Sequence, residues 1–326
     1  MTVDSSQTSD VEEIIRTDDL TKQYAGMDVA AVDKLNLKVH RGEIFGLLGP
    51  NGAGKTTTAG ILTTRVVPTS GSASISGIDV KKHPALVKQL SGIVSQQNTL
   101  DRQLNVWENL YYHGRLFGIN AKDSRRRSDE LLERFSLSRW AKASVYALSG
   151  GMAQRLMVAR AIFHYPAVLF MDEPTAGLDP QSRLALWDLL TELNTAGQTV
   201  MLTTHYMEEA DQLCDRVAIM DHGKILALDT PANLKKSTGS DTTVTIKVAA
   251  KADELAENLR RDIDAIVGTR VTDNTLFVEM RSTERLVPRL VASAETSNIE
   301  ILDLAVAEPT LETVFINLTG KELREA

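Results

Sequence analysis

The segment Gly49-Pro50-Asn51-Gly52-Ala53-Gly54-Lys55-Thr56 places glycines, a lysine and a threonine at the spacing of a phosphate-binding loop. An apolar run over residues 44–48 precedes it and indicates a buried strand, and further threonines, Thr57 first, suit a helix start. Glycines let successive backbone N–H groups face phosphate oxygens, and the helix adds its positive end. Lys55 can place a charge on the β- and γ-phosphates, and the Thr56 hydroxyl can ligate Mg²⁺. The pattern predicts a nucleoside-triphosphate site.

Two carboxylates, Asp172 and Glu173, follow a second apolar run over residues 167–171. A buried parallel strand delivers its carboxyl end to the edge where α/β sheets place their chemistry. Asp172 suits outer-sphere coordination of Mg²⁺, and Glu173 can accept a proton from an attacking water. The alternative, two surface acids at a strand end, is disfavoured by the phosphate loop upstream.

Other side chains could serve the same site. Ser149-Gly150-Gly151 puts an N-cap residue and two glycines at a predicted helix start, which is a second anion-binding helix end, although many helices begin this way. His205 ends an apolar strand, where structural and catalytic roles are both open. Gln96 leaves a short strand into a polar loop, and Tyr24 could stack on a base or pack at a strand end.

Alternating strands and helices must position these residues, so the main part of the chain is predicted to be α/β. The amphipathic stretches within residues 101–165 predict a mostly helical insertion, and residues 217–228 predict a hairpin. The remaining expected strands are 14–24, 31–39, 44–48, 72–78, 91–97, 167–171 and 199–203, and the remaining helices are 59–66 and 182–193.

From about residue 241 the pattern changes. Strands are expected over 242–249, around Asp273-Asn274 on both sides, and over 299–305, and helices over 253–261, 284–295 and 310–318. This β-α-β-β-α-β order with a closing helix predicts a small ferredoxin-like α+β module. The predicted domains are a disordered tail (1–13), a nucleotide-binding domain (14–238, with a helical subdomain at about 98–165) and an accessory domain (239–326).

Composition is that of a globular protein: 326 residues, 43% apolar and 24% charged. No apolar run approaches the ~20 residues that span a bilayer, and the polar N-terminus is unlike a signal peptide. A single cysteine, Cys214, excludes an internal disulfide and fits a reducing compartment. The net charge of −7 argues against a nucleic-acid partner, and Arg125-Arg126-Arg127 lies among acids as a solvated helix face would.

Together these features resemble the ATP-binding subunit of an ABC transporter, from residue 14 onward. Six motifs occur in that family's order: the Walker A motif at Gly49–Thr56, the Q-loop at Gln96 (or Gln97), the signature at Leu148-Ser149-Gly150-Gly151, the Walker B motif and catalytic glutamate at 168–173, the D-loop at Gly177-Leu178-Asp179 and the switch histidine at His205. The signature continues as Met152-Ala153-Gln154, where many members carry Gln or a basic residue. Segments 105–110, 308–315 and 318–324 resemble daunorubicin-resistance-like exporters of the ABC-2 type, which is a less specific likeness.

The resemblance implies a P-loop ABC ATPase fold, with a RecA-like core, an antiparallel β edge and a helical subdomain, that binds ATP and Mg²⁺. It implies catalytic roles for Glu173, His205 and Gln96, and metal contacts from Thr56, Gln96 and Asp172. Nucleotide contacts are expected from Tyr24, Gly49, Pro50, Asn51, Gly52, Ala53, Gly54, Lys55, Thr56, Thr57 and Asp172 and, from a second copy, Ser149, Gly150, Gly151 and Asp179.

Two copies, or a homologous pair, are expected to meet head to tail around ATP, on the cytoplasmic face of the plasma membrane and attached to a separate ABC-2-type permease. The surface around residues 96–117 is the expected docking face, with aromatic side chains that could equally be internal packing: Trp107, Tyr111, Tyr112 and Phe117. The implied function is ATP-driven export of a drug-like or lipid-type substrate. The alternatives are the ATPase of an importer, which the C-terminal module disfavours, and a soluble ABC protein of ribosomes or DNA, which usually has tandem cassettes.

Overall fold

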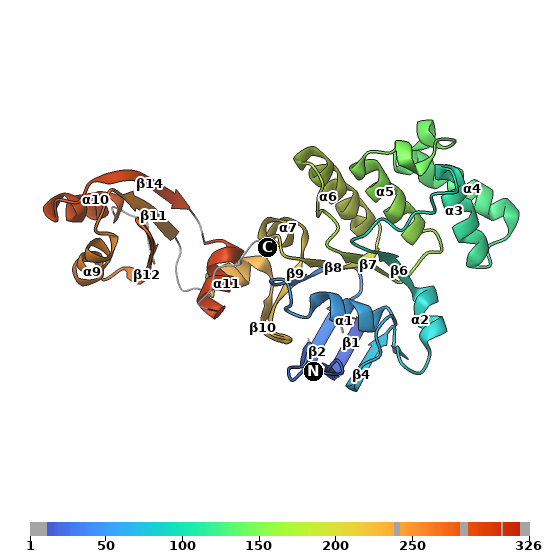
Figure 1. Cartoon of the computed structure of the whole chain (residues 1–326), viewed down its shortest axis with the longest axis horizontal. Coiled ribbons are helices and arrows are strands. Elements are labelled where there is room, and N and C mark those ends of the chain that lie inside the picture. The colour runs from blue at the N-terminus through green and yellow to red at the C-terminus, as the bar shows by residue number, and fades with distance from the viewer. Residues whose placement is uncertain (1–11, 238–241, 281–285, 308, 320–326) are drawn as a thin grey trace, which may run out of the picture. The chain divides into compact units, whose positions relative to one another are not determined.

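In the computed structural model, residues 12–237, 242–280, 286–307 and 309–319 are described, and the chain divides into two compact units between Leu228 and Asp229 (Figure 1). Residues 1–11 of the predicted tail lie outside the described part, as do 320–326, which hold much of the third segment that suggested the subtype. Within the described ranges, no helix has the length and apolar character needed to cross a membrane.

A six-stranded sheet forms the centre of the first unit, in the order β10-β9-β3-β8-β7-β6. The pairs β3–β8, β3–β9, β7–β8 and β6–β7 are parallel. Every residue of β3, β7 and β8 is buried, as expected of strands covered on both faces. The strands are β3 (Ile44–Leu48), β6 (Ser91–Val94), β7 (Val168–Asp172), β8 (Thr199–Thr204), β9 (Arg216–Asp221) and β10 (Lys224–Asp229).

A smaller antiparallel sheet in the order β2-β1-β4-β5 supplies the β edge. Its apolar residues share one hydrophobic core with the six-stranded sheet and with α1 (Lys55–Leu62), which lies between the two sheets in Figure 1. The strands are β1 (Glu13–Lys22), β2 (Val32–His40), β4 (Ser70–Ile75) and β5 (Ile78–Asp79).

Left-handed residues correct two predicted elements. The single strand expected over 72–78 is wrong: Ser76 (φ 48°) and Gly77 (φ 75°) form a turn between β4 and β5. The helix expected over 59–66 instead begins at Lys55 and ends at Leu62. Thr64 has φ 63°, and the N–H groups of residues 65 and 66 both return to the carbonyl oxygen of Gly60, which closes the helix.

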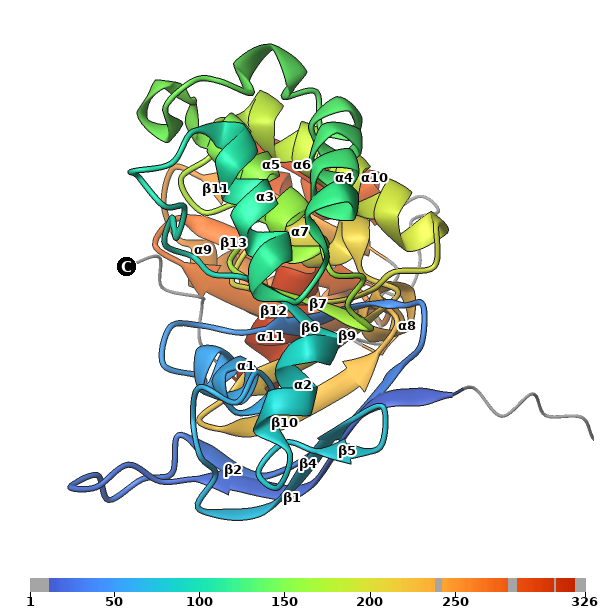
Figure 2. The same cartoon turned by 90° about the vertical axis from the view of Figure 1, so that its right-hand side faces the viewer.

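The predicted helical stretch is confirmed, with α3 and α4 side by side in Figure 2 and α5 packed against both. Side-chain N-caps begin its helices: Asn105 and Glu108 form a capping box on α3, Asn120 caps α4 and Ser149 caps α5. The helices of this unit are α2 (Pro84–Leu90), α3 (Val106–Leu116), α4 (Ala121–Arg134), α5 (Gly150–Ala161), α6 (Pro180–Thr195) and α7 (Met207–Leu213), with short 3-10 turns at Ser138–Trp140 and Val145–Ala147.

The second unit contains the predicted ferredoxin-like order, in an antiparallel sheet β12-β13-β11-β14. The buried faces of α9 and α10 pack on one side of this sheet around Ile246, Leu259 and Leu290. Helices α8 and α11 contact each other in the same unit. The elements are α8 (Pro231–Lys236), β11 (Thr242–Val248), α9 (Ala252–Asp262), β12 (Ile266–Thr272), β13 (Thr275–Met280), α10 (Leu286–Thr296), β14 (Ile301–Ala307) and α11 (Leu311–Thr319).

Candidate nucleotide-binding and hydrolysis site

The phosphate loop connects β3 to α1 and is tightly enclosed. A Cβ atom on Gly49 would lie 2.1 Å from the carbonyl oxygen of Met220, and one on Gly54 would lie 2.3 Å from that of Ala31. Gly54 also has φ 105° as the N-cap of α1. Only glycine fits these positions, so the loop is held in one shape with its N–H groups at a helix start.

Lys55 is 3% exposed at the first position of α1. Its ammonium donates hydrogen bonds to the carbonyl oxygens of Gly49 (2.7 Å) and Pro50 (3.0 Å). Burial lowers the pKa of Lys55, and the carboxylates of Glu173 and Asp172 oppose that shift. A desolvated ammonium gains more from phosphate oxygens than from neutral carbonyls, so this lysine suits an anionic ligand.

Asp172 ends β7 close to two hydroxyl groups. Its Oδ1 atom accepts hydrogen bonds from Thr203 Oγ1 at 2.6 Å and from Thr56 Oγ1 at 3.2 Å. A carboxylate and a hydroxyl are hard oxygen donors, which Mg²⁺ prefers with phosphate and water completing its coordination. Among the described residues no group of three or more His, Cys, Asp or Glu could form an all-protein metal cage. The carboxylate and hydroxyl donors fit a Mg²⁺ ion whose other ligands are phosphate and water.

Glu173 is the point on which the candidate catalytic side chains converge. Its Oε2 atom accepts a hydrogen bond from Gln96 Nε2 at 3.0 Å. Its Oε1 atom lies 3.2 Å from His205 Nδ1, without the alignment of a hydrogen bond, and 3.8 Å from Lys55 Nζ. The carboxyl group thus contacts an amide, an imidazole and an ammonium within one site.

The backbone of Glu173 is itself unusual. Its φ of 48° is left-handed, a conformation that non-glycine residues adopt at a cost and keep where surrounding contacts enforce it. Its N–H donates to the carbonyl oxygen of Thr203 at 3.0 Å and to the Thr203 hydroxyl at 3.2 Å. Thr203 therefore hydrogen-bonds the Asp172 carboxylate and holds the Glu173 backbone. The sequence does not predict this role, because the only signal is a threonine directly before Thr204-His205.

Parallel strand order explains why these side chains meet. Gln96 follows β6, Glu173 follows β7 and His205 follows β8, and these three strands are adjacent in the sheet. Their carboxyl ends share the edge beside the phosphate loop, as in other open α/β sheets. Gln96 rather than Gln97 has the contact to Glu173.

Tyr24 lies on the rim of this site. Its hydroxyl group is 3.5 Å from Thr57 Oγ1 on α1, and Lys22 Nζ lies 4.9 Å from the centre of its ring. The side chain is 39% exposed, so the ring is not part of the core. An exposed ring next to the phosphate loop is available for stacking.

Ser149, Gly150, Gly151 and Asp179 gather at a second place. Ser149 Oγ accepts from the Met152 N–H at 3.3 Å as the N-cap of α5, and Asp179 caps α6 by accepting from the N–H and hydroxyl of Ser182. These hydrogen bonds lower the pKa of Asp179. A Cβ atom on Gly151 would lie 2.5 Å from Ser182 Oγ, so the two helix starts are in contact. In the part of the chain that the structure describes, no hydrogen bond or ion pair joins this group to the phosphate loop.

The site combines a phosphate loop, a neighbouring aspartate and glutamate, and a glutamine and a histidine at adjacent strand ends. The helical insertion adds a helix that begins at Ser-Gly-Gly. These features define a P-loop ATPase of the ABC class. The family model "ABC transporter" matches residues 32–176. The daunorubicin resistance ATP-binding protein DrrA3 of Streptomyces coeruleorubidus is 39% identical over 95% of this chain and 97% of its own length. The Nod factor export ATP-binding protein I of Ralstonia nicotianae is 40% identical over 96% and 95%.

A solved ATP-binding cassette, a dimer in a post-hydrolysis state with ADP and Pi, is 27% identical, with a TM-score of 0.60 over 66% of this chain and 98% of its own. The chain belongs to the ABC transporter family, as an ATP-hydrolysing member. The predicted resemblance to daunorubicin-resistance-like ATP-binding proteins is confirmed.

Proposed function

We propose that this chain is the ATP-hydrolysing subunit that powers an ABC-2-type exporter of drug-like or lipid-type compounds from the cytoplasmic face of the plasma membrane. The observation that carries the proposal is Glu173, whose carboxylate contacts Gln96, His205 and Lys55 beside the phosphate loop. The named relatives cover the second unit as well as the first, and their printed names refer to daunorubicin resistance and Nod factor export. These relatives favour export over the importer reading.

Different residues of the site have different roles in ATP binding and hydrolysis. The loop N–H groups and Lys55 bind the phosphates, and Tyr24 stacks on the base. Thr56, Asp172 and Gln96 are the residues that would hold Mg²⁺, which when bound neutralises phosphate charge. Glu173 accepts the proton of the attacking water, and His205 contacts the γ-phosphate.

Two copies complete the site. The Ser149-Gly150-Gly151 helix start is a second anion-binding element, and it is not part of the phosphate site that its own chain forms. In a dimer it would face the γ-phosphate bound by the other copy, with Asp179 beside the same interface. ATP then favours the closed pair, because the γ-phosphate makes these contacts only in that state.

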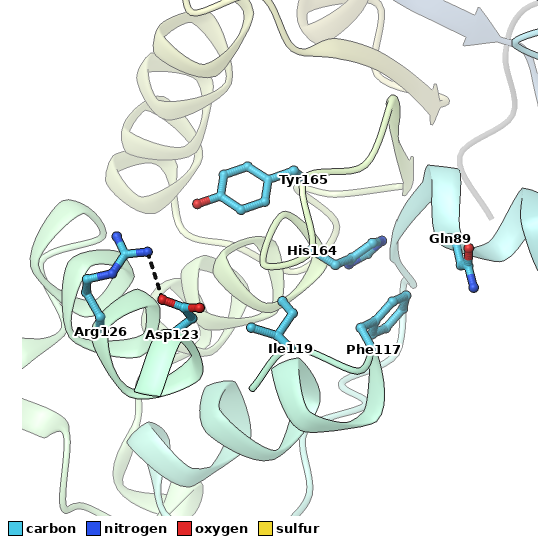
Figure 3. Close-up of a pocket in the computed structure, with 7 residues that line it drawn as sticks. All are labelled: Gln89, Phe117, Ile119, Asp123, Arg126, His164 and Tyr165. Carbon is cyan, nitrogen blue, oxygen red and sulfur yellow. Dashed lines mark hydrogen bonds and ion pairs between the residues drawn. The ribbon is translucent and has the colours of Figure 1, made fainter. Parts of the chain in front are cut away.

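A hollow of about 470 Å³ on the first unit is the proposed site for the permease (Figure 3). Phe117 and His164 stack at 3.8 Å in its wall, and Arg126 pairs with Asp123 across the helix surface. Tyr112 and Leu116 are exposed apolar side chains on α3, the helix that ends next to Phe117. A recess lined by both aromatic and charged side chains fits an amphipathic helix of the membrane subunit. It is lined by Gln89, Phe117, Ile119, Asp123, Arg126, His164 and Tyr165.

The Glu173→Gln variant tests the ATPase part of this function. The amide keeps the size and hydrogen-bonding oxygen of the carboxylate but cannot take a proton, so ATP binding should be retained while turnover falls by roughly 10²–10⁴-fold. Binding of a fluorescent ATP analogue and phosphate release report the two effects. The exposed Glu208→Gln is the matched control. Near-normal turnover in Glu173→Gln would contradict the assignment.

A further inference from the structure

The loop that carries Gln96 is fixed at both of its ends to different parts of the first unit. Upstream, β6 is paired with β7 in the six-stranded sheet. The Gln96 side chain donates a hydrogen bond to Glu173. Downstream, from Thr99 onward, the chain is held by side chains of the helical insertion.

Arg160, near the end of α5, donates two hydrogen bonds to Thr99 of this loop. Its Nη1 atom donates to the Thr99 carbonyl oxygen at 2.8 Å, and its Nη2 atom donates to the Thr99 hydroxyl at 2.5 Å. Arg160 is half-buried, and the Asp101 carboxylate nearby favours the charge of its guanidinium. Two hydrogen bonds from one planar guanidinium fix both the position and the orientation of Thr99, because a movement of the loop away from α5 would break both.

Asn109 of α3 holds the next part of the loop. This side chain is 4% exposed, and its Oδ1 atom accepts from the Asp101 N–H at 2.8 Å. Its Nδ2 atom donates to the carbonyl oxygens of Asp101 and Asn105, each at 3.0 Å. The amide therefore ties residues 101–105 to the helix that carries Leu116 and ends beside Phe117.

The same helices lead to the other functional surfaces. Helix α5 begins at the Ser149-Gly150-Gly151 segment and ends with Arg160 and Ala161. One helix therefore carries both the second anion site and the arginine that hydrogen-bonds Thr99. Helix α3 carries Asn109 in the middle and ends next to the Phe117–His164 stack. The loop that places Gln96 beside Glu173 is thus joined to both helices by the hydrogen bonds of Arg160 and Asn109.

We propose that Arg160, supported by Asn109, is a positioning residue that fastens the Gln96 loop to α5 and α3. The placement of Gln96 beside Glu173 then fixes where the Ser149-Gly150-Gly151 helix start stands. This inference rests on the proposed function, because the helix start matters only if it completes the ATP site of a second copy.

Arg160→Met is the principal test, since Met keeps much of the apolar stem and removes both donors. The expected result is unchanged binding of a fluorescent ATP analogue to the full chain, with kcat lowered roughly 2- to 30-fold, the range of mutations that change coupling between sites. The matched control is Arg155→Met on the same helix, whose guanidinium donates to the Phe135 carbonyl oxygen inside the insertion at 3.4 Å. It should keep wild-type kcat.

Thr99→Val supplies a second route if Arg160→Met folds poorly, as judged by thermal unfolding. It removes the hydroxyl that accepts from Arg160 and should lower kcat, as Arg160→Met does. Thr99→Ser keeps that hydroxyl and should have the wild-type kcat. Combined with Arg160→Met, its effect should be clearly less than additive, because both changes break one contact.

The outcomes separate this inference from the proposed function. If wild type hydrolyses ATP and Glu173→Gln does not, but Arg160→Met and Thr99→Val turn over like Arg155→Met, the positioning role is wrong and the ATPase stands. Additive effects in the double variant would equally overturn it. If wild type itself fails to hydrolyse ATP, the proposed function fails first.

Discussion

Glu209 is a fully buried carboxyl group in α7, four residues after His205. Its Oε1 atom accepts a hydrogen bond from Trp187 Nε1 of α6 at 3.3 Å. Burial raises the pKa of Glu209, and the nearby hydroxyls of Thr204 and Thr175 counter only part of that shift. One carboxyl group therefore lies between the end of β8, which His205 follows, and helix α6.

Glu209→Gln should remove a pH dependence of stability. A carboxyl group whose folded pKa is raised binds more protons in the folded than in the unfolded chain, so its contribution is fully present below the unfolded value of 4.5 and is lost as pH rises through the folded value. The Gln variant keeps the acceptor for Trp187 and has no proton to lose.

Thermal unfolding of wild type and Glu209→Gln across pH 5 to 8 measures this effect. The variant should gain on wild type as pH rises, by up to about 1.4 kcal/mol per pH unit within the titration range. The exposed neighbour Glu208→Gln should shift little. A difference between Glu209→Gln and wild type that stays constant with pH would contradict the assignment.

At the residue scale, the sequence predicts those members of the site that lie at the ends of apolar runs. Gln96, Glu173 and His205 converge because parallel strands share one edge, which strand patterns alone can indicate. Thr203, Glu209 and Arg160 could not be found this way. Their partners come from distant elements, and a threonine, a helical glutamate or a helical arginine has no local pattern that marks a buried role.

At the element scale, α3 has two faces with different uses. Gly114 faces inward, and a Cβ atom there would lie 2.2 Å from the ring of Phe163, so only a glycine allows this close packing. The aromatic residues predicted as candidates divide between the two readings. Trp107 stacks on Tyr111 at 4.9 Å and donates to Asp129 at 2.7 Å, as internal packing would, whereas Tyr112 is exposed.

Leu116→Asp should weaken capture of the membrane subunit without altering the isolated ATPase. Leu116 is 85% exposed, so a charge there costs the fold little but opposes an apolar partner. Pull-down from native membranes with tagged Glu173→Gln and ATP, followed by mass spectrometry, should recover a polytopic membrane protein. The added Leu116→Asp change should reduce that recovery, and Val67→Asp, at a 61% exposed site between α1 and β4, should not. Equal recovery in both would place the docking surface elsewhere.

Long apolar or amphipathic elements were predictable from sequence, and short ones were not. Strands β3, β7 and β8 follow from uninterrupted apolar runs. Helices α2 and α7 have seven residues each, too few for a helical period to show, and they were not predicted. The β4–β5 turn was missed because Ser76 and Gly77 continue an alternating pattern while their backbones reverse the chain.

At the scale of the whole molecule, each chain carries one phosphate loop and one Ser-Gly-Gly helix start, and among the described residues no hydrogen bond or ion pair joins the two. Sequence order alone could not show this, because the motifs are spaced along the chain as they would be in a self-contained site. The proposed twofold dimer would use both elements of both chains and so would have two equivalent ATP sites. This arrangement has a consequence that a self-contained site lacks: two differently damaged copies can restore each other.

Mixing Lys55→Ala with Gly150→Glu tests that consequence. Lys55→Ala removes the phosphate-binding ammonium. Gly150→Glu puts a carboxylate at the helix start, where the helix dipole stabilises it but a γ-phosphate would be repelled. The position has room, since the nearest atom to an added Cβ is Leu178 Cδ2 at 3.7 Å. Each variant alone should be nearly inactive, because neither homodimer has a complete site.

In an equal mixture about half of the dimers pair the two variants, and each of these has one intact site, so phosphate release should recover to about a quarter of the wild-type rate if the sites act independently. The intact site joins the phosphate loop of the Gly150→Glu copy to the helix start of the Lys55→Ala copy. A mixture no more active than its components, with the variants shown to exchange partners, would mean that each chain completes its own site.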